Sequence, residues 1–158
     1  MVLKLEGGGD CVKKLTKSVE IEASPEKVFA FIIDEKKMND AMKGWAESEL
    51  TSEGPVGVGT TLHFVGVSGE TQAEWDMEVI EFVKNKKMEM RTRGATPFKM
   101  TRSFALELTA KGTKLTYSGD YEVPNYIRGK LVDKRTVRGD IEKHNTKMLE
   151  NIKKALES

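Results

Sequence analysis

The sequence predicts an α+β fold in which an antiparallel β-sheet is covered on one face by a long C-terminal helix. Apolar and polar residues alternate with period two from Trp45 to Val123, which is typical of strands with one buried and one wet face. Turn signals such as Gly54-Pro55 separate the alternating segments. The chain then ends in a helical stripe of apolar residues, at Ile141, Met148, Leu149, Ile152 and Leu156.

The first residues of the chain are expected to form a flexible arm. Three successive glycines, Gly7 to Gly9, stand within residues 1–11, a segment without hydrophobic periodicity. The remaining residues show no repeat, low-complexity tract or linker, and their number suits one domain. We therefore expect a single folded domain over residues 12–158.

One strand and two short helices are predicted next. Val19 and Ile21 alternate with polar neighbours, which indicates a strand. The strand stops at Ser24-Pro25, where serine can cap a helix and proline can occupy its first turn. The apolar run that follows predicts a short helix, and a second helix is expected over residues 36–42.

The inward face of the predicted sheet is rich in methionine and aromatic side chains. Most apolar strand faces belong to an ordinary packed core. Methionine also suits a binding cavity, because its flexible thioether adapts to varied ligands. The side chains of this face, which fit either a packed core or a binding cavity, are Trp75, Met77, Met88, Met90, Met100, Phe104, Tyr117 and Tyr121.

Arg102 is the most informative single residue of this face. Alternation places it inward, between Met100 and Phe104. A buried guanidinium must be paired or must serve an acidic group of a ligand, unless a β-bulge turns it outward. Tyr117 and Tyr121 are either orienting groups for a ligand or core tyrosines with satisfied hydroxyls.

Composition excludes several classes of protein. The chain has 26 Lys and Arg residues against 25 Asp and Glu residues, a balance that argues against binding nucleic acid. No apolar run reaches the roughly 18 residues that cross a bilayer, and no secretory signal is visible, so we expect no stable membrane insertion. The single cysteine, Cys11, cannot form an internal disulfide, and the cytoplasm is the expected compartment.

No motif for catalysis or metal binding stands out. The glycine-rich stretch over residues 54–60 lacks the lysine and the following helix of a phosphate-binding loop, so we interpret it as a loop between strands. His63 and His144 belong to different elements, and His63 is expected to face outward. We therefore assign no catalytic residue, no metal site and no cofactor.

Five segments in this order carry a resemblance to a known family. They are SVEIEASPEKVFAFIID at 18–34, GPVGVGT at 54–60, WDMEVIEFVKNKKMEMRTRG at 75–94, GTKLTYSGDYEVP at 112–124 and GKLVDKRTVRGDIEKHNTKMLENIKKALE at 129–157. Together they resemble the START-like (helix-grip, SRPBCC) superfamily, specifically its polyketide cyclase/dehydrase and lipid-transport group.

The resemblance implies a curved sheet that grips the C-terminal helix around a hydrophobic cavity. Such proteins typically bind lipids, sterols, polyketides, quinones or hormone-like molecules, and a minority are cyclases or chaperone cofactors. The family has no universal catalytic motif, so enzymatic activity stays open. The residues expected to bind the ligand are Trp75, Met77, Met88, Met90, Met100, Arg102, Phe104, Tyr117, Tyr121, Ile127 and Leu131.

The long helix is predicted to extend upstream to Ile127 and Leu131, with interruptions at Gly129 and Gly139. Each glycine should cost about 1 kcal/mol relative to alanine. Residues 125–158 contain nine Lys and Arg against five Asp and Glu. This excess could attract an acidic ligand or make transient contact with an anionic membrane, or it is a solvated face.

Three functions remain open at this point. The first is binding or carriage of a small hydrophobic ligand, such as a lipid, polyketide or quinone-like molecule. The second is a cyclase or dehydratase acting on a polyketide-like chain. The third is a protein-interaction module that uses the outer face of the sheet, although that face lacks an apolar patch. Oligomeric state and ligand identity are not predicted.

Overall fold

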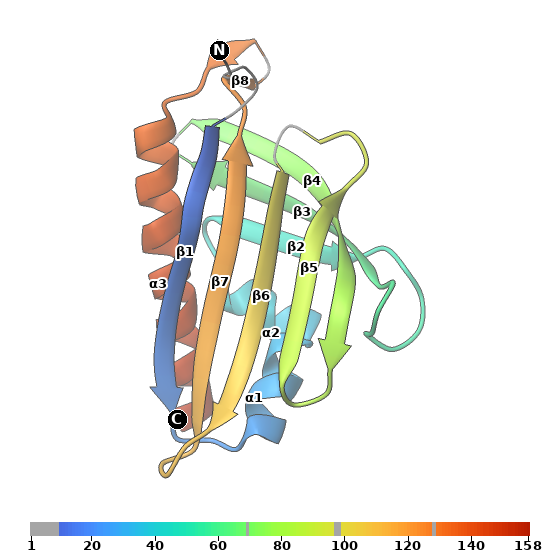
Figure 1. Ribbon diagram of the computed structural model, residues 1–158, viewed down its shortest axis with the longest axis vertical. Helices are drawn as coiled ribbons and strands as arrows, with labels where there is room; N and C mark the ends of the chain where they lie inside the picture. The colour runs from blue at the N-terminus through green and yellow to red at the C-terminus, as the bar shows by residue number, and fades with distance from the viewer. Residues whose placement is uncertain (1–9, 69, 97–98, 128) are drawn as a thin grey trace.

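The computed structural model describes residues 10–158 except residues 69, 97–98 and 128 (Figure 1). The chain begins with β1 (Asp10–Ile21), α1 (Pro25–Ile32), α2 (Glu35–Ala41), β2 (Ala46–Leu50) and β3 (Thr61–Ser68). It continues with β4 (Thr71–Val83), β5 (Lys87–Arg93), β6 (Lys99–Leu108), β7 (Thr113–Val123), β8 (Tyr126–Ile127) and β9 (Lys130–Leu131). The last element is α3 (Lys134–Glu157). The predicted α+β class is confirmed.

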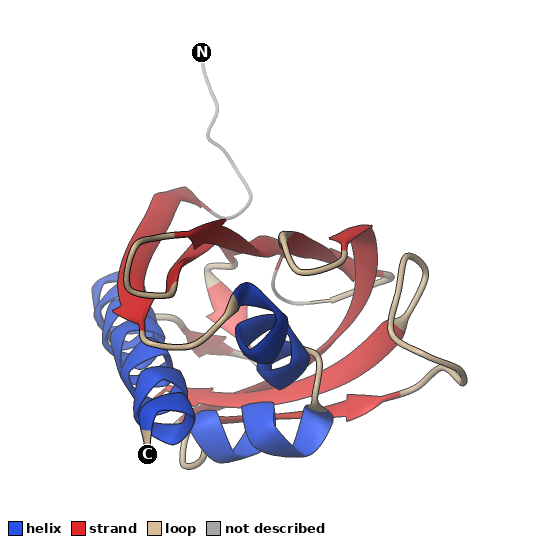
Figure 2. Cartoon of the chain, turned by 90° about the horizontal axis from the view of Figure 1, so that it is seen from below, coloured by secondary structure: helices blue, strands red, loops and turns tan. Residues whose placement is uncertain are grey.

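The main sheet curls around the helices. Its seven strands follow the order β1-β7-β6-β5-β4-β3-β2, and every neighbouring pair is antiparallel. Figure 2 shows the sheet bent into a trough, with α3 along one side and α1 and α2 across its lower end. This is the predicted helix-grip arrangement, and it brings β3 and β7 opposite the same long helix.

Short polar caps begin the two small helices. Ser24 Oγ accepts a hydrogen bond from the Lys27 backbone N–H at 3.3 Å, as its position before Pro25 predicts. Asp34 Oδ1 accepts one from the Lys37 N–H at 3.0 Å and begins α2. Both helices therefore lie close to their predicted positions.

A β-bulge in β4 changes which residues face the core. The pairing with β5 shifts register between Val79 and Glu81. Before the bulge the odd-numbered residues face inward, whereas after it Phe82 does, and its ring meets Phe29 edge-on at 5.2 Å. Glu81 faces outward, where its carboxylate pairs with Lys87 at 3.0 Å.

The start of α3 corrects the sequence prediction. Ile127 and Leu131 lie in the β8–β9 hairpin and not in the helix. Gly129 adopts a φ of +78°, far from the value of about −63° that an α-helix requires, so no helix continues through it. Asp133 then caps α3 by accepting hydrogen bonds from the N–H groups of Arg135 and Thr136.

The predicted boundary of the N-terminal arm also moves. Asp10 and Cys11 belong to β1, where they pair with Val123 and Glu122 of β7. Residues 1–9 lie outside the described residues. The strand therefore begins two residues before the predicted domain does.

Most of the buried apolar side chains among the described residues belong to two clusters. The larger one fills the trough beneath α1, α2 and the second half of α3. The smaller one gathers Leu15, Tyr121, Val123, Ile127, Val132 and Val137 at the opposite end. Met100 packs against both clusters and links them. In the described part of the chain, no helix combines the length and hydrophobicity needed to cross a membrane.

Candidate functional site

Two small cavities lie between the concave face of the sheet and the helices. The inner cavity has a volume of about 40 Å³ and is enclosed by α2 and strands β2 to β6. The outer cavity has a volume of about 120 Å³ and lies between the sheet and the first half of α3. Arg102, Phe64 and Met42 line both cavities and form the partition between them.

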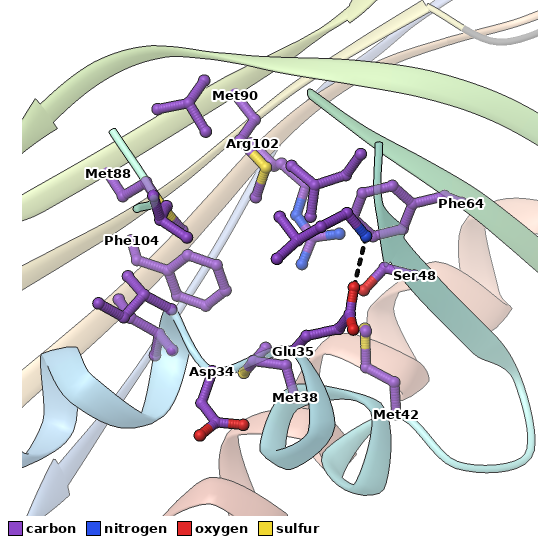
Figure 3. A pocket seen from close by; sticks show the side chains of 16 residues that line it. Asp34, Glu35, Met38, Met42, Ser48, Phe64, Met88, Met90, Arg102 and Phe104 are labelled. Atoms are coloured by element: carbon purple, nitrogen blue, oxygen red, sulfur yellow. Dashed lines mark hydrogen bonds between the residues drawn. The ribbon is translucent and has the colours of Figure 1, made fainter. Parts of the chain in front are cut away.

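The inner cavity is mostly apolar, with two carboxylates, those of Asp34 and Glu35, at its edge. Figure 3 shows Met88, Met90 and Phe104 along the sheet side of the cavity, and Glu35 reaching it from α2. The Glu35 carboxylate accepts a hydrogen bond from the Leu50 backbone N–H. This bond ties the first turn of α2 to the end of β2.

The outer cavity has aromatic walls. The rings of Phe64 and Trp75 stack with centroids 5.8 Å apart, and Trp75 lies across Gly66. A Cβ atom added to Gly66 would lie 2.7 Å from the Trp75 ring, so glycine is needed for this packing. On the helix side, Trp45 stacks on His144 with ring centroids 4.9 Å apart.

A chain of hydroxyl and amide groups lines the floor of the outer cavity. The Tyr117 and Tyr121 hydroxyls are 3.5 Å apart, and Asn145 Nδ2 donates to the Tyr121 hydroxyl at 3.4 Å. Burial raises the pKa of Tyr121 well above its ordinary value, and the neighbouring Tyr117 adds to this. Tyr121 is therefore a neutral phenol. Gly119 leaves the space that its ring occupies, since an added Cβ would lie 2.6 Å from the hydroxyl.

Arg102 projects into the partition between the cavities, as strand alternation predicts. It is 7% exposed, and no β-bulge turns it outward. Its guanidinium carbon lies 5.1 Å from the ring centroid of Phe64, 5.7 Å from that of Phe104 and 5.2 Å from that of Tyr117. The side chain is thus surrounded by aromatic faces.

Helix α3 contributes a carboxylate, Asp140, and an imidazole, His144, to the outer cavity. Asp140 Oδ2 accepts a hydrogen bond from the Ser68 hydroxyl at 2.5 Å and so joins α3 to the end of β3. His144 lies one turn further along α3. Burial lowers the pKa of His144 and the Lys143 charge lowers it further, while Asp140 opposes them. The imidazole is therefore neutral near pH 7.

The structure brings together most of the residues that the sequence selects, but divides them between the cavities. Met88, Met90 and Phe104 line the inner cavity, Arg102 lines both, and Trp75, Met100, Tyr117 and Tyr121 line the outer one.

Three of the selected residues lie elsewhere. Met77 has no exposed surface and lines neither cavity. Ile127 is buried in the smaller apolar cluster, and Leu131 is 74% exposed in the hairpin. The prediction for Ile127 and Leu131 rested on a helix that continued upstream of Lys134, whereas the chain forms the β8–β9 hairpin there.

Sequence reasoning missed the polar groups that α3 contributes. His144 follows Val137 and Ile141 at helical spacing and precedes Met148, so the apolar stripe itself places it on the buried face. Asn145 is one residue further and is also buried. The periodicity was a usable signal for His144, but its nearness to Trp45 was not visible in the sequence.

His63 faces outward, as predicted. Its Nδ1 lies 2.7 Å from Asp76 Oδ1 and its Nε2 lies 2.9 Å from Glu74 Oε1, on the outer face of the sheet. Within the described residues, no group of three or more His, Cys, Asp and Glu side chains is placed to hold a metal ion.

Comparisons with known proteins agree with this architecture. The family model described as polyketide cyclase/dehydrase and lipid transport matches residues 13–157. The aromatase/cyclase Zhui from Streptomyces sp. R1128 has a TM-score of 0.76 at 15% identity, over 94% of both chains. Protein TTHA0849 from Thermus thermophilus has a TM-score of 0.70 at 18% identity, over 90% of this chain and 98% of that one.

The protein Ara h 8.0201 shares the fold as well. Its TM-score is 0.66 at 14% identity, over 93% of this chain and 98% of that one. No curated protein sequence matches the chain closely enough to count as a relative.

Proposed function

Because the chain belongs to the polyketide cyclase/dehydrase and lipid transport family, we propose that it binds and carries a small hydrophobic molecule in the outer cavity. The observation that carries this proposal is an apolar cavity between the sheet and α3, walled by Trp45, Trp75 and Met100. Apolar cavities with a few convergent polar groups are the usual form of small-molecule sites.

The size of the cavity limits what enters without rearrangement. An apolar cavity of about 150 Å³ accepts one benzene molecule, and the outer cavity is somewhat smaller at about 120 Å³. A lipid, polyketide or quinone-like ligand would need the partition to move. A shift of Arg102, Phe64 and Met42 would join the two cavities into one longer site.

Tryptophan fluorescence gives a direct test, because both tryptophans of the chain line the outer cavity. Ala73 is 4% exposed and also lines it. We expect Ala73→Leu to fill the cavity and weaken binding of apolar compounds by tenfold or more, which corresponds to about 1.4 kcal/mol of binding free energy. Titration of a panel of ring compounds, medium-chain lipids and quinones, followed by fluorescence, measures this.

Ala105→Leu is the matched control, because Ala105 lies exposed on the outer side of β6. It should leave binding unchanged. If no compound of the panel alters the fluorescence of the wild-type protein, or if both variants bind as the wild type does, the cavity is not the binding site.

A second candidate function is a cyclase or dehydratase, and one observation favours it. A neutral imidazole, His144, and a carboxylate, Asp140, line the same cavity as Tyr117 and Arg102, and such chemistry needs a positioned acid or base. Incubation with a short poly-β-carbonyl substrate, with ring closure and water loss followed by mass spectrometry, tests this function. His144→Asn should abolish turnover and His63→Asn, on the outer face, should not.

A further inference from the structure

Arg102 is the charged side chain that lines both cavities among the described residues. It lies in β6, and its register partner in β7 is Gly119, where the Tyr121 ring occupies the space that a side chain would need. Figure 3 shows the guanidinium extending from the strand into the inner cavity. The side chain is 7% exposed, so its charge has lost almost all contact with bulk water.

The guanidinium has no hydrogen-bonding partner in the described part of the chain. Its Nε is buried and makes no hydrogen bond, and no ion pair joins Arg102 to any described carboxylate. The rings of Phe64, Phe104 and Tyr117 attract the cation, but a ring face offers no oxygen to the N–H groups. A buried arginine normally has such an oxygen.

The carboxylates that line the cavities are engaged elsewhere. Glu35 accepts from the Leu50 N–H, and Asp34 accepts from the Lys37 N–H at the start of α2. Asp140 accepts from Ser68. Each holds two elements together or caps a helix, and none of them forms an ion pair with the Arg102 guanidinium. The positive charge in the partition is therefore left without an anion from the described residues.

We propose that the molecule bound in this site is an organic anion, with its apolar body in the outer cavity and its carboxylate, enolate or phenolate oxygens on Arg102. This inference rests on the proposed binding function and names the class of ligand. Arginine suits the task because its planar fork can donate two parallel hydrogen bonds to one carboxylate. Trp75 and Met100 contact the apolar body, and Tyr117 lies beside the anionic group.

Matched pairs of ligands test the charge without changing the protein. Benzoate and benzamide have nearly the same shape, and only benzoate is an anion at neutral pH; hexanoate and hexanamide form an aliphatic pair. We expect the wild-type protein to bind each acid about tenfold or more tightly than its amide, as a charge-assisted bidentate pair allows. Calorimetry and tryptophan fluorescence measure both affinities.

Substitution of Arg102 tests whether this residue causes the preference for acids over amides. In Arg102→Met we expect the acid-to-amide ratio to fall to about one while the amide still binds, because methionine keeps the volume and removes the charge. The variant should unfold at the same or a higher temperature, since an unpaired buried charge is lost. Arg91→Met is the matched control, because Arg91 is exposed on the outer side of β5, and it should keep the preference.

The outcomes separate the two proposals. If neither acids nor amides bind, and the wider panel also fails, the proposed function is wrong. If acids and amides bind the wild-type protein equally, binding stands and the anion inference is overturned. A preference that survives in Arg102→Met overturns the role of Arg102, and a large loss of stability in that variant would show that the guanidinium serves the fold instead.

Discussion

Arg102 and His63 lie on opposite faces of one sheet and have opposite electrostatic surroundings. The imidazole of His63 contacts two carboxylates, Asp76 and Glu74, in water. The guanidinium of Arg102 is buried, lies against three aromatic rings and forms no ion pair with a described residue. A cation without an anion is tolerated at a binding site and not usually in a structural core, which is why Arg102 and not His63 indicates function.

The two histidines of the chain should titrate in a definite order. Hydrogen bonds that the His63 ring donates to Asp76 and Glu74 raise the pKa of His63 above 6.5, whereas burial lowers the pKa of His144 below 6.5. NMR titration of the imidazole signals measures both values, with His63→Gln to assign them. A His144 midpoint above that of His63 would contradict the structure.

The raised pKa of His63 also sets the direction of a pH effect on stability. Protonated His63 favours the folded state, so its contribution is complete below pH 6.5 and is lost as pH rises through the folded-state value. The group is partly exposed, and we expect a small effect. The difference in unfolding free energy between the wild type and His63→Gln, from urea denaturation, should shrink as pH rises.

At the scale of elements, local signals predicted the helices wherever a cap and a periodic stripe agreed. Ser24-Pro25 marks the start of α1 because both residues act within a single turn. The predicted C-terminal helix begins too early in the chain, because Ile127 and Leu131 happen to continue the spacing of the apolar residues of α3. Asp133, a good N-cap residue, was the competing signal that marks the true start.

Two glycines of this region should respond oppositely to alanine. Gly139 lies inside α3, and an added Cβ would meet nothing within 4 Å, so Gly139→Ala should stabilise the fold by about 1 kcal/mol. Gly129 has a φ of +78°, so Gly129→Ala should destabilise it by about 1 kcal/mol. Urea denaturation of both variants measures this contrast. The same sign for both would mean that the hairpin or the helix differs from the structure described.

At the scale of the whole molecule, one sheet carries both apolar clusters. Leu15 belongs to the smaller cluster, while Trp75 packs against the larger one. Met100 contacts both, and β1, β6 and β7 run through each. The two clusters are therefore expected to unfold together.

We predict a single cooperative unfolding transition for this chain. Leu15→Ala should lower the unfolding free energy by about 2 kcal/mol or more and shift the midpoint seen by tryptophan fluorescence and by far-UV circular dichroism equally. The tryptophans lie on the other cluster, so their response reports coupling. Two separate transitions, or a fluorescence midpoint that is the same in Leu15→Ala as in the wild type, would show that the smaller cluster folds independently.

The sequence by itself determined the α+β class, the order of the first strand, the two short helices, the sheet and the long helix, and the inward side of the strands away from the bulge in β4. The direction of the side chains repeats every two residues in a strand and about every 3.6 residues in a helix. The spacing of apolar residues along the chain therefore indicates these properties, and Arg102 could be placed inward from its neighbours alone. The tertiary structure decided which side chains meet. The cavity volumes, the engagement of Glu35 and Asp140, and the approach of His144 to Trp45 depend on distances between segments far apart in the chain, and no local period encodes such distances.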